Sequence, residues 1–162
     1  LQGLIFDIRG NPGGLLTAAV DLSSLFIEDG VILYEAFGDG REEVFEATGA
    51  YGDIQVPVVV LVDETSASAS ELVAGAVKDT GVATVIGETT FGKGTVQTIQ
   101  PLPNGGAVRL TVARWLTPQR NWIHEQGVTP DVIVEWDPET LEDLENDIQL
   151  QGAVDYLLGL TD

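Results

Sequence analysis

Two periods of apolar residues run along the chain, one typical of helices and one typical of strands. In residues 15–26 the apolar positions recur as in a helix that packs on a sheet. Residues 56–62 form a continuous apolar run, which is typical of a central strand buried on both faces. Further strands are predicted over residues 3–9 and 83–87, and a last helix is predicted near residues 149–158.

Two β-hairpins are predicted where glycine-rich turns separate pairs of strand-like segments. One turn contains the sequence GDG at residues 38–40, and the other contains NGG at residues 104–106. The first hairpin pairs residues 30–35 with 42–47, and the second pairs residues 95–102 with 107–116. Together with the helices, these strands predict an α/β core in which a mixed β-sheet is flanked by helices.

The length and composition of the chain are those of one globular domain. It has 162 residues, of which 44% are apolar, enough to build a single core. The formal net charge of −19 argues against nucleic acids and anionic membranes as partners, because lysine and arginine bind phosphate groups. No apolar run approaches the roughly 20 residues of a membrane span. The absence of cysteine excludes disulfide and thiol chemistry.

Two short segments carry the residue types that a serine hydrolase without a catalytic histidine requires. The sequence SASASE at residues 66–71 opens a predicted helix, and FGKGTVQ at residues 91–97 places a lysine 25 residues after Ser68. A serine hydroxyl must pass its proton to a neighbouring base as it attacks. The single histidine, His124, lies in a polar stretch without a nearby serine or paired acid, and is predicted to be a loop or surface residue.

A lysine can serve as the base where burial and a lack of carboxylates lower its pKa from about 10.4 towards 7 to 8. The chain has only two lysines. Lys78 follows an apolar run, as a lysine near a helix C-terminus does, and is predicted to be structural. Lys93 lies between two glycines on a tight connection, where glycine lets the backbone approach another segment closely. Lys93 is therefore the candidate base.

Other interpretations stay open for both segments. Ser68 and Glu71 also fit a capping box, which is compatible with catalysis because a helix N-terminus offers unpaired amides to a developing oxyanion. Residues 87–93 match the first seven places of a phosphate-binding loop. However, Gly94 stands where that loop has a serine or threonine, and the residues that follow are typical of a strand rather than a helix. A phosphate-binding loop is therefore disfavoured.

A third segment, GNPGG at residues 10–14, follows the first predicted strand. Glycines after a strand expose backbone amides, which can supply half of an oxyanion hole while the residue after the nucleophile, Ala69, supplies the other half. A simple strand-to-helix turn is the alternative. Asp7 and Arg9 alternate on one face of the strand and are predicted to form an ion pair. The acidic segment 137–147 is predicted to be a solvated linker and a first helical turn.

These segments resemble, in the same order, the catalytic core of the C-terminal processing proteases, also called tail-specific proteases. The likeness covers nearly the whole chain and includes a fourth segment, VTPDV at residues 128–132. It implies that the α/β core has a crotonase-like topology. By position, it also implies a role for each candidate residue: nucleophile Ser68, general base Lys93, lysine-orienting Gln97, and oxyanion-hole amides from Ala69 and from Gly13 or Gly14.

The resemblance implies a serine endopeptidase that cleaves protein substrates near their C-termini through an acyl-enzyme, with no metal or other cofactor. Its partners would then be proteins or peptides with accessible C-termini. Its location would be the bacterial cell envelope, periplasmic or extracellular. Family members usually carry a PDZ domain and a further core strand ahead of the segment where this chain starts. Residues 1–162 are therefore expected to be an excised catalytic core, weak or inactive alone, whose exposed surface can drive dimerisation.

A non-catalytic function is the alternative, because the same fold occurs in retinoid-binding relatives that lack the catalytic residues. The chain could also be a folding or interaction module on that fold. The presence of Ser68, Lys93 and Gln97 together favours the protease.

Overall fold

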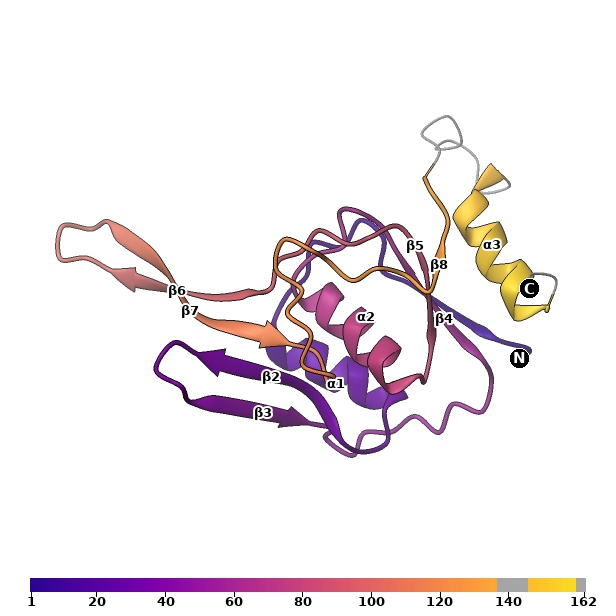
Figure 1. Cartoon of the computed structure of the whole chain (residues 1–162), viewed down its shortest axis with the longest axis horizontal. Helices are drawn as coiled ribbons and strands as arrows, with labels where there is room; N and C mark the ends of the chain where they lie inside the picture. Colours follow the sequence, from indigo (N-terminus) through magenta and orange to yellow (C-terminus); the bar gives the residue numbers. More distant parts are fainter. Residues whose placement is uncertain (137–145, 160–162) are drawn as a thin grey trace.

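Two four-stranded sheets, one parallel and one antiparallel, carry the strands of the chain (Figure 1). The structure is a computed structural model that describes residues 1–136 and 146–159. The parallel sheet has the order β1-β4-β5-β8, with β1 at Leu4–Asp7, β4 at Val58–Val62, β5 at Thr84–Gly87 and β8 at Val132–Ile133. All five residues of β4 are buried, which confirms the central strand predicted from its apolar run.

The antiparallel sheet contains both predicted hairpins. Its order is β3-β2-β7-β6, with β2 at Val31–Phe37, β3 at Glu42–Glu46, β6 at Thr95–Pro101 and β7 at Ala107–Leu116. The hairpins join through β2, which pairs only with the last four residues of β7. The rest of the β6–β7 hairpin extends from the body as a two-stranded arm (Figure 1), and every residue from 97 to 112 is exposed. The predicted α/β class is confirmed, with the two kinds of strand in separate sheets.

Helices cover both faces of the parallel sheet. The helices are α1 (Leu16–Phe26), α2 (Ala69–Thr80) and α3 (Ile148–Leu157), which confirms the two predicted terminal helices. Val58, Val60 and Val62 of β4 pack in one core with α1 and α2. Val59 and Leu61 face the other way and pack with α3. This alternation along one buried strand is why the sequence of β4 is apolar throughout.

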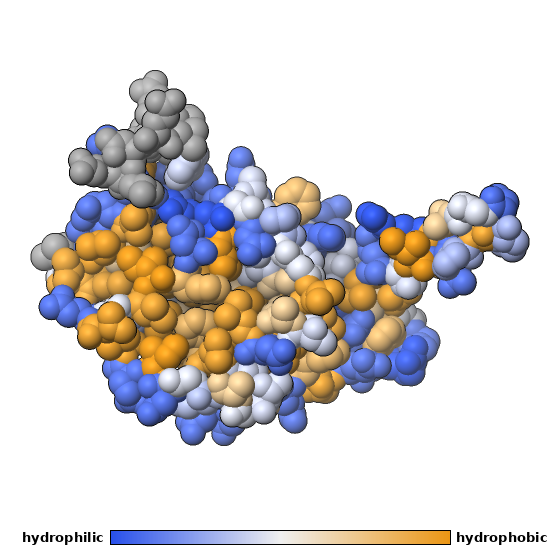
Figure 2. All heavy atoms as spheres, turned by 180° about the vertical axis from the view of Figure 1, so that it is seen from behind, coloured by the Kyte–Doolittle hydropathy of each residue, from blue (hydrophilic) through white to orange (hydrophobic). Residues whose placement is uncertain are grey.

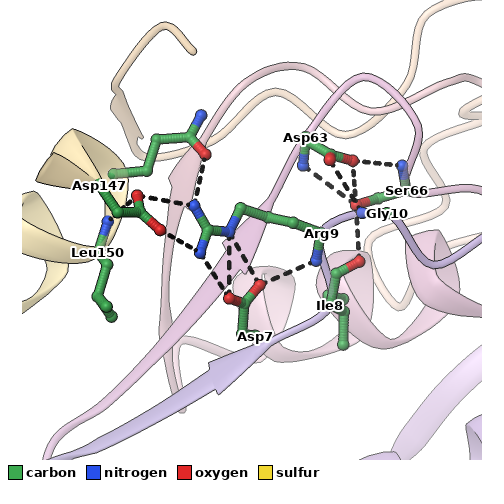
Figure 3. A network of polar contacts seen from close by, with 9 residues as sticks. Asp7, Ile8, Arg9, Gly10, Asp63, Ser66, Asp147 and Leu150 are labelled. Carbon is green, nitrogen blue, oxygen red and sulfur yellow. Dashed lines mark hydrogen bonds and ion pairs between the residues drawn. The ribbon is translucent and has the colours of Figure 1, made fainter. Parts of the chain in front are cut away.

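A polar network fastens α3 to the carboxyl end of β1 (Figure 3). Arg9 Nη2 lies 2.7 Å from Asp7 Oδ2, which confirms the predicted ion pair, and 2.8 Å from Asp147 Oδ2. The pKa of Arg9 is raised, chiefly by Asp7, and Arg9 in turn lowers the pKa of Asp147. Asp147 caps α3 by accepting from Leu150 N at 2.9 Å. Most of the predicted acidic linker, residues 137–145, lies outside the described residues.

Lys78 is structural, as the sequence predicts. It lies in the last turn of α2, and its Nζ donates to Thr129 O at 2.7 Å and contacts Asp131 Oδ1 at 2.9 Å. Asp131 Oδ2 also accepts from Val85 N at 2.9 Å. Segment 128–132 thus fastens the end of α2 to β5.

Apolar side chains also reach the surface. A broad apolar area covers much of the rear face of the body, and the arm mixes apolar with polar residues (Figure 2). Exposed apolar side chains of the arm are Ile99, Leu102, Val108, Leu110 and Val112. Exposed apolar surfaces of this size often mark sites of protein–protein interaction. They are compatible with the predicted dimerisation, which stays a prediction. In the described part of the chain, no helix has the length and apolarity needed to cross a membrane.

Candidate active site

Ser68 occupies a sharp turn between β4 and α2. It is the N-cap of α2, and its backbone angles are φ 55° and ψ −114°. A positive φ is unfavourable for a residue with a side chain, and such strain persists only where the surroundings enforce it, often at active sites. A half-buried serine on a strained strand–turn–helix connection resembles the geometry of a nucleophile elbow. Residues 63–68 are called the elbow below.

Glu71 joins the elbow to the lysine segment. Its side chain is fully buried, and its carboxylate accepts four hydrogen bonds. Oε2 accepts from Ser68 N and Lys93 N, each at 2.8 Å. Oε1 accepts from Thr90 Oγ1 and Gly92 N, each at 2.6 Å. The sequence identified Glu71 only as a capping residue. In the structure, one carboxylate oxygen bridges the backbones of the two principal candidates.

The backbone around Lys93 is held closely, while its side chain is exposed. A Cβ on Gly94 would lie 2.5 Å from His124 N, so the predicted close approach of this loop to another segment is confirmed. Glu125 N and Trp122 Nε1 donate to Gly92 O and Gly94 O, each at 2.9 Å. Within residues 1–136 and 146–159, Lys93 Nζ forms no hydrogen bond or ion pair.

His124 and Gln97 both lie near this lysine segment, in ways the sequence did not specify. His124 is a partly buried loop residue whose Nδ1 lies 3.2 Å from Gly92 O. Gln97 is exposed on β6, and its Nε2 donates to Thr111 Oγ1 at 3.4 Å. The structure therefore brings the backbones of Ser68 and Lys93 together, but does not bring the Gln97 amide onto the lysine.

The two candidate glycines of the oxyanion hole have different settings. Gly13 has φ 100°, and a Cβ on it would lie 2.5 Å from Ala67 O and 2.8 Å from Ala69 N. Gly13 therefore packs directly against the elbow, where only glycine fits. Its amide donates to Asn11 Oδ1 at 2.9 Å. Gly14 has open space around its Cα and no positive φ. Ala69 N belongs to the first turn of α2, where helix amides lack helical partners.

An apolar cavity opens beside these amides. Its volume is about 140 Å³, and Gly13, Gly14 and Ala69 are among its lining residues. Phe6 of β1, Ile8 just after that strand, Leu22 of α1 and Val73 of α2 also line it. Among the described residues, no three His, Asp or Glu side chains are grouped so as to hold a metal ion.

Comparison with known proteins gives consistent matches. The model of peptidase family S41 matches residues 1–134. A carboxyl-terminal-processing protease of Synechocystis sp. is 42% identical over 160 residues, covering 98% of this chain and 37% of the relative. The carboxy-terminal processing protease CtpA of Bacillus subtilis is 45% identical over 135 residues, covering 83% of this chain and 29% of the relative. The chain thus spans about a third of these relatives.

Solved structures give the same result. A photosystem II D1 C-terminal processing protease superposes with a TM-score of 0.80 at 43% identity, covering 90% of this chain and 38% of that one. A putative S41 protease from Bacteroides fragilis also reaches a TM-score of 0.80, at 19% identity and with 45% of its own length covered. At that lower identity the likeness supports the fold alone.

Proposed function

The chain belongs to peptidase family S41, and from this premise we propose that it is the catalytic core of a serine endopeptidase that cleaves proteins near their C-termini. Ser68 is the nucleophile, Lys93 the general base and Gln97 the residue that orients the lysine. The oxyanion hole consists of the Ala69 amide and an amide of Gly13 or Gly14; the Gly13 amide donates to Asn11 Oδ1 and must exchange that bond for the oxyanion. The relatives' names, which refer to carboxyl-terminal processing, support this substrate class.

The strained backbone of Ser68 is the observation that carries the proposal. A capping serine needs only an extended backbone, whereas Ser68 has φ 55°. The conformation presents Ser68 at the N-terminus of α2, where unpaired amides and the helix dipole favour a developing negative charge. Glu71 supports the pairing with Lys93, because one oxygen accepts from both backbones.

The reaction follows from these positions. Ser68 Oγ attacks the scissile carbonyl carbon as its proton passes to the amine of Lys93, and the carbonyl oxygen becomes an oxyanion held by the backbone amides. The C–N bond then breaks, and the lysine returns the proton to the leaving amine. A water molecule, deprotonated by the same lysine, hydrolyses the acyl-enzyme and frees Ser68.

In the proposed mechanism, substrate binding brings the Lys93 amine into its active environment. The Lys93 side chain is exposed without substrate, and a neutral amine is needed for proton transfer. A peptide that lies across residues 91–97 covers the lysine and excludes water from it. The Gln97 amide, which bonds to Thr111 at 3.4 Å, exchanges that long contact for the lysine.

The apolar cavity supports a preference at the cleavage site. It adjoins the Gly13, Gly14 and Ala69 amides, so it receives the side chain of the residue whose carbonyl is attacked. At about 140 Å³, its volume suits a small or medium apolar side chain. We therefore propose cleavage after such residues.

A non-catalytic ligand-binding or interaction module is the second candidate. The exposed Lys93 side chain and the contact of Gln97 with Thr111 favour it. The broad apolar area of Figure 2 would then be the binding surface. Ser68 argues for the protease, because a binding module has no use for strain at that position.

Location and further partners stay proposals. The family resemblance supports the cell envelope of a bacterium, periplasmic or extracellular. Relatives include bacterial proteases and a C-terminal processing peptidase of Tetradesmus obliquus that is named chloroplastic. Residues 1–162 as one catalytic core, separate from a PDZ domain, and a possible dimer are proposed on the same basis.

Cleavage of an unstructured peptide with an apolar C-terminus, followed by mass spectrometry, tests the function. The parent is compared with Ser68→Ala and Lys93→Arg, the second of which keeps the charge but removes a usable base. We expect slow cleavage by the parent, because a core without its PDZ domain is expected to be weak, and no detectable cleavage by either variant. Unchanged cleavage by Ser68→Ala would eliminate this nucleophile. Binding of the peptide without cleavage by the parent would favour the second candidate.

A further inference from the structure

The serines on either side of Ser68 both bond to the glycine-rich loop, defined here as residues 8–14. Ser70 Oγ donates to Asn11 O at 3.0 Å, and Ser70 is only 5% exposed. Ser66 Oγ lies 2.9 Å from Ile8 O, and Ser66 is fully buried. Two buried hydroxyls, one before and one after Ser68 in the sequence, thus bond to the same loop.

Asp63 strengthens the attachment on the Ser66 side (Figure 3). One carboxylate oxygen accepts from Gly10 N at 2.9 Å, and the other accepts from Ser66 N at 2.8 Å. Asp63 N donates in turn to Ser66 Oγ at 3.1 Å. The carboxylate therefore binds both the elbow and the loop. Charge-assisted bonds of this kind are stronger than neutral ones.

Asn11 carries the Ser70 attachment onward to Gly13. Asn11 O accepts from Ser70 Oγ and Ala67 N, each at 3.0 Å. The side chain of the same residue accepts from Gly13 N at 2.9 Å. Gly13 in turn packs against Ser68, since a Cβ on it would lie 2.9 Å from Ser68 Cβ. Asn11 therefore links Ser70 of α2 to Gly13, the residue that packs against Ser68.

We infer that Ser70 is a positioning residue, which fixes the amides of the glycine-rich loop relative to Ser68 Oγ, while Ser66 and Asp63 anchor the other end of the loop. The inference rests on the proposed function. An oxyanion forms only during the reaction, so loss of this fastening lowers kcat more than it raises KM. A misplacement of about 1 Å near reacting atoms can cost up to about a hundredfold in rate.

Two variants of nearly equal volume test the hydroxyl of Ser70. Ser70→Thr keeps the hydroxyl and Ser70→Val replaces it with a methyl group. We expect Ser70→Val to lower kcat about tenfold with KM within about twofold, and Ser70→Thr to restore most of the loss. Amide hydrogen exchange in residues 8–14 should be faster in Ser70→Val than in Ser70→Thr. If the added methyl group of Ser70→Thr or Ser70→Val prevents folding, Ser70→Ala is compared with the parent instead.

Ser23→Ala is the matched control. Ser23 lies on α1 with a buried hydroxyl that has no hydrogen-bond partner among the described residues, so its loss should leave kcat and loop exchange unchanged. Equal exchange of the loop in Ser70→Val and Ser70→Thr overturns the inference, whether or not the parent cleaves peptide. Faster exchange with unchanged kcat overturns the role in catalysis. If the parent is inactive alone, as a core without its PDZ domain is expected to be, loop exchange alone decides the positioning role.

Discussion

The two halves of the candidate site differ in how firmly they are held. The nucleophile half, residues 8–14 and 63–71, is fastened by buried side chains, with Glu71 and Ser66 fully buried. The base half, residues 91–97, has a fixed backbone near Lys93 but exposed side chains at Lys93 and Gln97. Its C-terminal end continues into the exposed arm.

The difference suggests that the oxyanion donors are fixed before substrate binds, whereas the general base is oriented only when substrate binds. Oxyanion stabilisation requires donors that are fixed before the reaction begins, because reorganising them costs free energy at the transition state. A general base can be oriented as substrate closes over it, since catalytic hydrogen bonds often tighten only in the complex. The nucleophile half meets the first requirement, and the base half is open to the second.

The largest effect is expected at the junction of the two halves. Glu71→Gln replaces two acceptor oxygens with one, while four donors still point at the side chain. We expect the free energy of unfolding to fall by about 3–5 kcal/mol, because buried donors lose their partners. Chemical denaturation measures this. Glu125→Gln, at an exposed position on the neighbouring loop, is the control. Equal stability of both variants would show that Glu71 does not join the halves.

Gly13 and Gly14 test the close packing of the nucleophile half. Gly13→Ala places a methyl group 2.5 Å from Ala67 O at φ 100°, so the loop must move. We expect about 2–3 kcal/mol of lost stability together with loss of cleavage. Gly14→Ala meets no atom within 4 Å and should change stability by less than about 0.5 kcal/mol. Thermal unfolding compares the two, and similar melting temperatures would contradict the assigned packing.

Acid should loosen the nucleophile half through Asp63. Burial raises the pKa of its carboxyl group, but hydrogen bonds from Thr65, Gly10 and Ser66 outweigh burial and lower it overall. A lowered folded-state pKa gives stability that is present above the unfolded value of about 3.9 and is lost as pH falls through the folded value.

Asp63→Asn should therefore cost about 1–2 kcal/mol at pH 7. The difference from the parent should shrink below about pH 4, where the parent's own carboxyl group takes up its proton. Urea unfolding at several pH values measures this. A difference that stays constant down to pH 2 would mean that the charge of Asp63 does not hold the loop.

The smallest effect on stability is expected in the base half. Gln97 is exposed and makes only one long hydrogen bond, so Gln97→Ala should change the free energy of unfolding by less than about 0.5 kcal/mol. If Gln97 orients Lys93 once substrate binds, kcat should nevertheless fall about tenfold. Gln100→Ala, on the same strand and also exposed, should change neither quantity. Equal kcat in both variants would remove Gln97 from the site.

Local patterns in the sequence predicted the elements well. The unbroken apolar run of β4 predicted a central strand, and glycine-rich turns predicted both hairpins. Neither pattern reports which strands pair across the chain, so the division into two sheets was not predicted. The crotonase-like topology stays a prediction from the family resemblance.

The contacts that assemble the site lie beyond local patterns. Glu71 was identified from its capping position, three residues after Ser68, but its bond to Lys93 spans 22 residues. The sequence indicated no role for Ser66 or Ser70, because their bonds to Ile8 and Asn11 cross 58 and 59 residues. A run of three alternating serines in a helix-capping segment is the one signal that could have suggested a shared role.

The central claim is that Ser68, rather than Ser66 or Ser70, is the nucleophile. Treatment with a fluorophosphonate, followed by proteolysis and peptide mapping by mass spectrometry, tests this most directly. Because Ser66 and Ser70 donate to backbone oxygens of the glycine-rich loop, we expect a single adduct, on Ser68, that is absent from Ser68→Ala. An adduct on Ser66 or Ser70, or none on a folded parent, would contradict it.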